Sequence, residues 1–137
     1  NYENVKNNTW LRDNVVEFEV DVFDTIAKNN IFINLRNNKE YEFSNLFLIA
    51  EITFPDGLRI VDTLEYEMTD KGGNFLGTGF TDVKENKLFY KENVRFLQKG
   101  LHILKVEHAM RKNSNIQGLD SLKGITDIGF RIETIQE

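Results

Sequence analysis

Two apolar runs joined by a turn sequence form the stretch LFLIAEITF-PDG-LRIVDTLEYEM, residues 46–68. Pro55 presets φ for a turn and Gly57 tolerates a positive φ, so the residues between the runs favour a tight reversal. The second run alternates between apolar and polar residues, which is typical of a strand with one buried face. The first run is apolar on both parities, which predicts a central strand covered on both faces. We therefore predict a β-hairpin over this stretch.

Alternation of the same kind recurs along the rest of the chain, and no helical pattern longer than one or two turns is found. Further strands are expected at residues 16–22, 31–35, 75–80, 101–110 and 128–132, and residues 88–90 and 93–97 are expected to form one strand or two. About eight strands separated by frequent turn signals are the signature of an all-β, antiparallel β-sandwich, and we expect it to be jelly-roll-like. The runs that are apolar on both parities favour two packed sheets over one open sheet.

The ends and connections give less definite signals. Residues 1–9 contain four Asn and almost nothing apolar, so we predict an N-terminal tether there and a single β-sandwich domain over residues 10–137. A short helical turn is expected at residues 26–27. Gly77 and Gly79 interrupt the run at 75–80, where strand glycines often mark a bulge or a close backbone approach.

Composition excludes several classes of function. The net charge of −5, with acidic residues scattered along strands, argues against a nucleic-acid groove, which needs clustered Lys and Arg. The chain has no Cys, so it has neither a thiolate nucleophile nor a Cys-ligated zinc site. His102 and His108 are expected on one face of one strand about 20 Å apart, too far to share a metal ion. Without a phosphate loop or a nucleophile elbow, we predict no metal, no cofactor and no catalytic residues.

Three charged residues lie at or beside apolar strands, where an unpaired charge is costly: Arg36, Asp62 and Arg111. Asp62 falls on the apolar parity of its run, and we expect Arg36 or Arg111 to satisfy it in a structural ion pair. Removing one partner of a buried pair costs about 3–5 kcal/mol. Ligand binding by Arg36 and Arg111 is the alternative interpretation, with Trp10 and Tyr41 as further candidate binding residues.

Short motifs in a fixed order resemble one family. They are Leu35-Arg36-Asn37, Tyr41, Asn45-Leu46, Asp62-Thr63, Asp70-Lys71-Gly72, Gly77-x-Gly79, His108-Ala109-Met110-Arg111 and Gly124-Ile-Thr-Asp-Ile-Gly129. The spaced matches run from Trp10 to Glu133 and resemble the GldH gliding-motility-associated lipoproteins of Bacteroidota. His108 stands where this family is expected to carry Gln.

The resemblance implies a lipid-anchored protein of the cell envelope, held by an acylated Cys upstream of Asn1, with a link to gliding motility and its secretion machinery but no assigned molecular activity. Because the usual catalytic machinery is missing from the sequence, we expect a non-enzymatic interaction or scaffold component of that machinery. We expect it at the outer membrane on the periplasmic side, with other envelope proteins as partners. The alternative is a carbohydrate-binding module. In that case Trp10, Tyr41, Phe89 and Tyr90 could furnish an aromatic platform for a glycan.

Overall fold

The computed structural model describes residues 2–4, 9–79, 82–110 and 121–135, and in these residues all regular structure is β-strand. The ten strands are β1 (Tyr2–Asn4), β2 (Thr9–Leu11), β3 (Val16–Val22), β4 (Asn29–Asn37), β5 (Asn45–Thr53), β6 (Arg59–Glu67), β7 (Lys84–Val94), β8 (Gly100–His108), β9 (Ser121–Lys123) and β10 (Ile125–Thr134).

The strands pair as one long hairpin. Its tip is the turn between β5 and β6, where the Phe54 carbonyl oxygen accepts a hydrogen bond from Gly57 N at 2.9 Å and Gly57 has a φ of 90°. Outward from this tip, β4 pairs with β7, β3 with β8, β2 with β9, and β1 with β10, all antiparallel. The stretch around Pro55 therefore lies at the centre of the pairing scheme.

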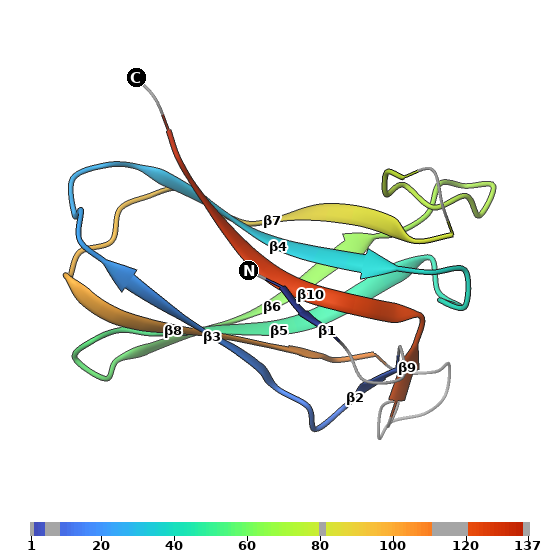
Figure 1. Ribbon diagram of the computed structural model, residues 1–137, viewed down its shortest axis with the longest axis horizontal. Coiled ribbons are helices and arrows are strands. Elements are labelled where there is room, and N and C mark those ends of the chain that lie inside the picture. The colour runs from blue at the N-terminus through green and yellow to red at the C-terminus, as the bar shows by residue number, and fades with distance from the viewer. Residues whose placement is uncertain (1, 5–8, 80–81, 111–120, 136–137) are drawn as a thin grey trace.

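The long hairpin wraps around itself to form two four-stranded sheets, because β10 also pairs with β4 and β5 also pairs with β8. The sheet orders are β1-β10-β4-β7 and β3-β8-β5-β6. Without the short β2–β9 pair, the eight remaining strands counted in chain order lie as 1-8-3-6 and 2-7-4-5, which is the order of a jelly roll. Figure 1 shows the two sheets as layers, with the hairpin tip at the left end. The predicted sandwich class is confirmed.

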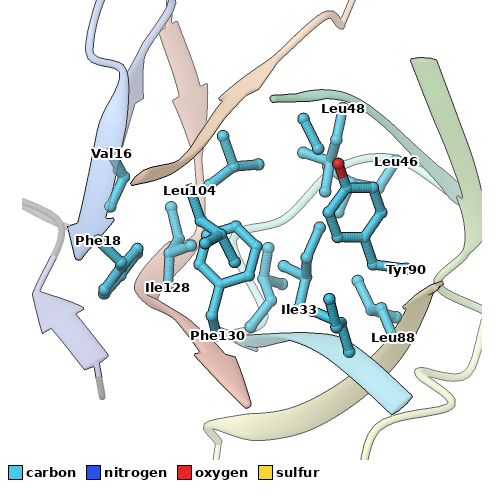
Figure 2. Packing of buried hydrophobic residues seen from close by; sticks show 14 of the residues in the cluster. Val16, Phe18, Ile33, Leu46, Leu48, Leu88, Tyr90, Leu104, Ile128 and Phe130 are labelled. Carbon is cyan, nitrogen blue, oxygen red and sulfur yellow. The ribbon is translucent and has the colours of Figure 1, made fainter. Parts of the chain in front are cut away.

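The core lies between the two sheets and is filled from both (Figure 2). Leu46, Leu48 and Leu104 project from one sheet, and Ile33 and Ile128 project from the other, all fully buried. Aromatic rings cross the gap between the sheets. Phe18 of β3 meets Phe130 of β10 edge to face, with ring centroids 5.2 Å apart. Such pairs stabilise the contact beyond the area they bury.

The predicted hairpin is confirmed, but its burial differs from the prediction. Along β5 the burial alternates strictly, so Phe47 and Ile49 are only half-buried rather than covered. Along β6 the predicted parity faces inward, yet Leu64 and Tyr66 are only half-buried because β6 is the edge strand of its sheet. The outer face of this sheet is therefore open to solvent.

Two local predictions are corrected, and one is confirmed. The run at 75–80 forms only isolated bridges, from Phe75 to Thr69 and from Thr78 to Glu85; Phe80 lies outside the described residues. The close backbone approach is confirmed, since a Cβ at Gly77 would lie 2.8 Å from the Glu85 carbonyl oxygen. No helical turn forms at residues 26–27.

In place of that helical turn, the Asp24 carboxylate accepts hydrogen bonds from the Ile26 and Ala27 amides and forms a bend. At the N-terminus, part of the predicted tether pairs with the fold, because residues 2–4 form β1 and Thr9 begins β2.

Candidate interaction surface

The predicted aromatic residues are mostly inside the fold. Trp10 and Tyr41 are buried, and Trp10 packs edge-on against His108 while its Nε1 donates to the Asn14 carbonyl oxygen at 2.8 Å. Tyr90 is also buried, which leaves Phe89 as the exposed member of the expected platform. These four side chains therefore form no common sugar-stacking surface.

Asp62 and Arg36 have other partners in the described residues than the ion pair that was predicted between them. Asp62 pairs with Lys91 at 3.0 Å and accepts a hydrogen bond from the Tyr90 hydroxyl. Arg36 pairs with Glu85 at 3.2 Å and with Asp127 at 3.8 Å, on the opposite sheet. The predicted Asp62–Arg36 pair is therefore corrected. Arg111 lies outside the described residues.

The two histidines are core residues in separate clusters. His102 lies between the rings of Phe54 and Phe96, and His108 contacts Trp10. Burial holds the pKa of His108 below its ordinary value, although the Trp10 carbonyl oxygen within hydrogen-bond distance of the ring acts in the opposite direction. In the part of the chain that the structure describes, no group of His, Asp and Glu residues could hold a metal ion.

The outer face of the sheet β3-β8-β5-β6 collects charged residues from four strands. The strand registers place Glu17, Lys105, Glu51 and Val61 side by side in one row. Lys105 Nζ lies 3.7 Å from a Glu17 oxygen and 3.8 Å from a Glu51 oxygen, so this lysine bridges two carboxylates at the centre of the row. We call this surface the acidic face.

Carboxylates dominate the acidic face. Its outward-pointing parity carries two cations, Arg59 and Lys105, and seven carboxylates: Glu17, Glu19, Asp21, Glu51, Glu65, Glu67 and Glu107. The balance on this one surface equals the net charge of the whole chain, −5. A field of one sign attracts partners of the opposite sign and repels other acidic surfaces.

Apolar side chains lie among these carboxylates. Phe47, Ile49 and Ile103 are half-buried on the acidic face, and Val61 is 57% exposed. A hollow of about 420 Å³ opens beside the central row. Its lining residues are Val15, Glu17, Ile49, Glu51, Val61, Lys105, Val106 and Glu107. An apolar centre with a charged rim is the usual anatomy of a protein-binding surface.

The outer face of the other sheet is balanced in charge. Its Lys87 and Arg131 both bind Glu133, at 2.8 Å and 2.6 Å, and these bonds hold the pKa of Glu133 below its usual value. Lys87 also lies over the Phe32 ring, 4.3 Å from its centroid. Because its cations and carboxylates are matched, this face offers a partner less unsatisfied charge than the acidic face.

Only the part of the acidic face that lies on β3 could be predicted from the sequence. The alternation of residues 16–22 indicates an acidic strand face in solvent, and Glu17, Glu19 and Asp21 are exposed. Their connection with Glu51 and Glu107 depends on β3 and β5 both pairing with β8. No local pattern specifies that pairing.

Fold and surface together define the class as a jelly-roll β-sandwich that presents one acidic sheet face to solvent. The chain belongs to the GldH lipoprotein family, whose family model matches residues 1–132.

Two relatives support this assignment. The chain is 52% identical over 132 residues to "Gliding motility lipoprotein GldH homolog" of Christiangramia forsetii, with 96% of this chain and 80% of the relative covered. It is 50% identical over 124 residues to "Gliding motility lipoprotein GldH" of Flavobacterium johnsoniae, with 90% and 77% covered. Among solved structures, the VP2 subviral particle of infectious bursal disease virus aligns with a TM-score of 0.40 at 17% identity, over 98% of this chain and 29% of that one.

Membership in a lipoprotein family supports attachment to the cell envelope through a lipid. None of the described residues belongs to a helix long and apolar enough to cross a membrane.

Proposed function

We propose that the domain is a non-enzymatic adaptor of the gliding-motility machinery or its associated secretion apparatus. In this proposal an upstream acylated Cys holds it at the periplasmic side of the outer membrane, and it binds a basic segment of another envelope protein on the acidic face. Anchoring confines the domain near its partners and raises their effective concentration, so a modest interface is sufficient.

The observation that carries this proposal is the composition of the acidic face. Half-buried apolar residues such as Ile49 and Ile103 could supply contact area, while the surrounding carboxylates would select a Lys- or Arg-rich partner. A sheet face of this kind also needs no rearrangement to become accessible. The names of both relatives associate those proteins with gliding motility, which supports the choice of machinery.

The carbohydrate-binding alternative receives less support, because Trp10, Tyr41 and Tyr90 are buried. We expect the purified domain to bind none of the glycans in a screening panel. We also expect it to turn over no generic ester, phosphate or glycoside substrate.

Photo-crosslinking in cells tests the adaptor role. A benzophenone amino acid is placed at Val61 on the acidic face or, as a matched control, at Phe89 on the opposite sheet; both positions are 57% exposed. We expect the Val61 probe to capture one envelope protein, with the crosslink mapping to a Lys- or Arg-rich segment. The Phe89 probe should not capture that protein.

Charge reversal on the acidic face is the second part of this crosslinking test. Glu19→Lys and Glu65→Lys change exposed residues on the acidic face and should abolish the Val61 crosslink while the melting temperature is retained. Equal capture from Val61 and Phe89, or a crosslink that survives both reversals, would contradict binding through the acidic face.

A further inference from the structure

The four most exposed large apolar side chains in the described residues all lie on loops at one end of the sandwich. Phe23 is 79% exposed, Ile26 81%, Leu58 67% and Leu97 84%. They belong to the connections β3–β4, β5–β6 and β7–β8, which Figure 1 shows together at the left end. We call this the loop end. Single exposed apolar residues are common on protein surfaces. Four of them on three neighbouring loops instead place exposed apolar surface at one end of the molecule.

Contacts join two of the three loops, and an electrostatic interaction relates the third loop to them. Gln98 Nε2 donates to an Asp56 oxygen at 3.0 Å, which connects the β7–β8 loop to the hairpin tip. Asp24 of the β3–β4 loop interacts electrostatically with Lys99. Gly100 also lies close to the Pro55 ring, because a Cβ there would be 3.5 Å from Pro55 Cγ.

The charge of the loop end differs from that of the rest of the chain. Residues 23–28, 54–58 and 95–99 carry three cations, Lys28, Arg95 and Lys99, against two carboxylates, Asp24 and Asp56. Their balance is slightly positive in a chain whose net charge is −5. Exposed apolar side chains among basic residues favour the interface of a bilayer that contains anionic lipid.

The direction of β1 relates the loop end to the lipid anchor of the family. Tyr2 pairs with Gly129 and Asn4 pairs with Asp127, so β1 begins on the side nearer the loop end and runs away from it. Along β10, Thr134 lies five positions after Gly129 and faces Asn29 at the start of β4. That distance is about 17 Å, which an extended segment of about five residues covers.

We propose that the loop end inserts into the surface of the membrane that holds the lipid anchor, as a second contact with the phospholipid bilayer. Phe23, Ile26, Leu58 and Leu97 would enter the boundary between headgroups and acyl chains, and the nearby cations would contact anionic headgroups. The acidic face lies along the side of the sandwich, so it stays in water and remains accessible to a protein partner. The lipid anchor and the loop end together would fix the orientation of the domain relative to the membrane, whereas a single flexible anchor would not.

Tryptophan fluorescence on tethered protein tests this insertion. Chain 1–137 with an N-terminal hexahistidine tag is bound to vesicles of phosphatidylethanolamine and phosphatidylglycerol (3:1) containing nickel-chelating lipid, which replaces the natural anchor. Leu97→Trp is the reporter, and Ile26→Trp is a second reporter on another loop. We expect both to shift to shorter wavelength and to lose emission when the lipids carry brominated acyl chains. Trp10 is buried and gives a constant background.

Leu76→Trp is the matched control, because Leu76 is 53% exposed in the connection between β6 and β7, outside the loop end. Its emission should be unchanged by brominated lipid. Absence of quenching at both Leu97 and Ile26, or equal quenching at Leu76, would overturn the proposal. A photo-crosslinker at Leu97 that captures a protein in cells, with no lipid quenching, would identify the loop end as a protein-docking surface instead. None of these outcomes depends on the crosslinking result at Val61.

Discussion

Two glycines with the same positive φ differ in the space around them, and replacing each by alanine separates two energetic effects. Gly57 at the hairpin tip and Gly124 between β9 and β10 both have a φ of 90°. A Cβ at Gly57 would have no heavy atom within 4 Å. A Cβ at Gly124 would clash with the Tyr41 nitrogen and would lie 2.7 Å from the Tyr41 Cα, and these are backbone atoms that cannot rotate away.

The expected magnitudes follow from these distances. Gly57→Ala meets only the cost of a positive φ, about 1–2 kcal/mol. Gly124→Ala meets the same cost and must also displace the chain around Tyr41, which adds about 1–3 kcal/mol if it behaves as an overpacked site. That chain is held in place by a hydrogen bond of 2.8 Å from Asn38 N to the Gly124 carbonyl oxygen. We therefore expect a total of about 2–5 kcal/mol for Gly124→Ala.

Thermal unfolding of both variants beside the wild type measures the difference. At about 2 cal/mol/K of unfolding entropy per residue, a chain of this length loses roughly 3–4 °C of melting temperature per kcal/mol. We expect a loss of about 3–7 °C for Gly57→Ala and about 7–17 °C for Gly124→Ala. Equal losses for the two variants would refute the argument, because they would show that the Tyr41 backbone does not restrict position 124.

Two smaller predictions concern charge. Burial lowers the pKa of His108, so the unfolded chain binds a proton more readily than the folded protein, and the free energy of unfolding should fall as the pH decreases from about 7.5 through 6.5. His108→Gln should flatten this part of a denaturant-derived stability profile; profiles that stay parallel would argue against His108 as the cause. Asp62 is about one-third exposed in its pair with Lys91, so Asp62→Asn should cost about 1 kcal/mol or less, and less still in 1 M NaCl. A loss above about 3 kcal/mol would indicate the buried pair that the sequence suggested.

Local patterns were sufficient for the longer strands and for the central turn, but not for the three-residue strands β1, β2 and β9. Pro55 and Gly57 specify a reversal within a few residues, and the alternation of Val16, Phe18 and Val22 reports one buried face directly. The glycine spacing at Gly77 also indicated a close approach, although it could not show that only isolated bridges would form there.

Partners of charged residues depend on which strands become neighbours, and the sequence does not contain that information locally. Arg36 meets Glu85, 49 residues away, because β4 pairs with β7. Asp62 meets Lys91 because the edge strands β6 and β7 lie close together, a contact also made by the Tyr66 hydroxyl and the Phe89 carbonyl oxygen.

The surface position of the apolar residues at the loop end could not be predicted from the sequence for a different reason. Leu97 follows a run of strand-forming residues and was assigned to a strand, because large apolar side chains are usually buried. Only the three-dimensional arrangement shows that the chain has already left β7 at Val94 and that Leu97 is at the surface.

The nested pairing of the strands has a consequence for how the chain folds. Thr53 and Arg59 meet across five intervening residues, whereas Tyr2 and Gly129 are separated by nearly the whole sequence. Forming the outermost pair first would require closure of a very long loop, but a chain that zips outward from the tip closes only a short additional loop at each step. The turn at Pro55 is thus the natural nucleus. Substitutions there should slow folding, whereas substitutions in β1 or β10 should mainly accelerate unfolding.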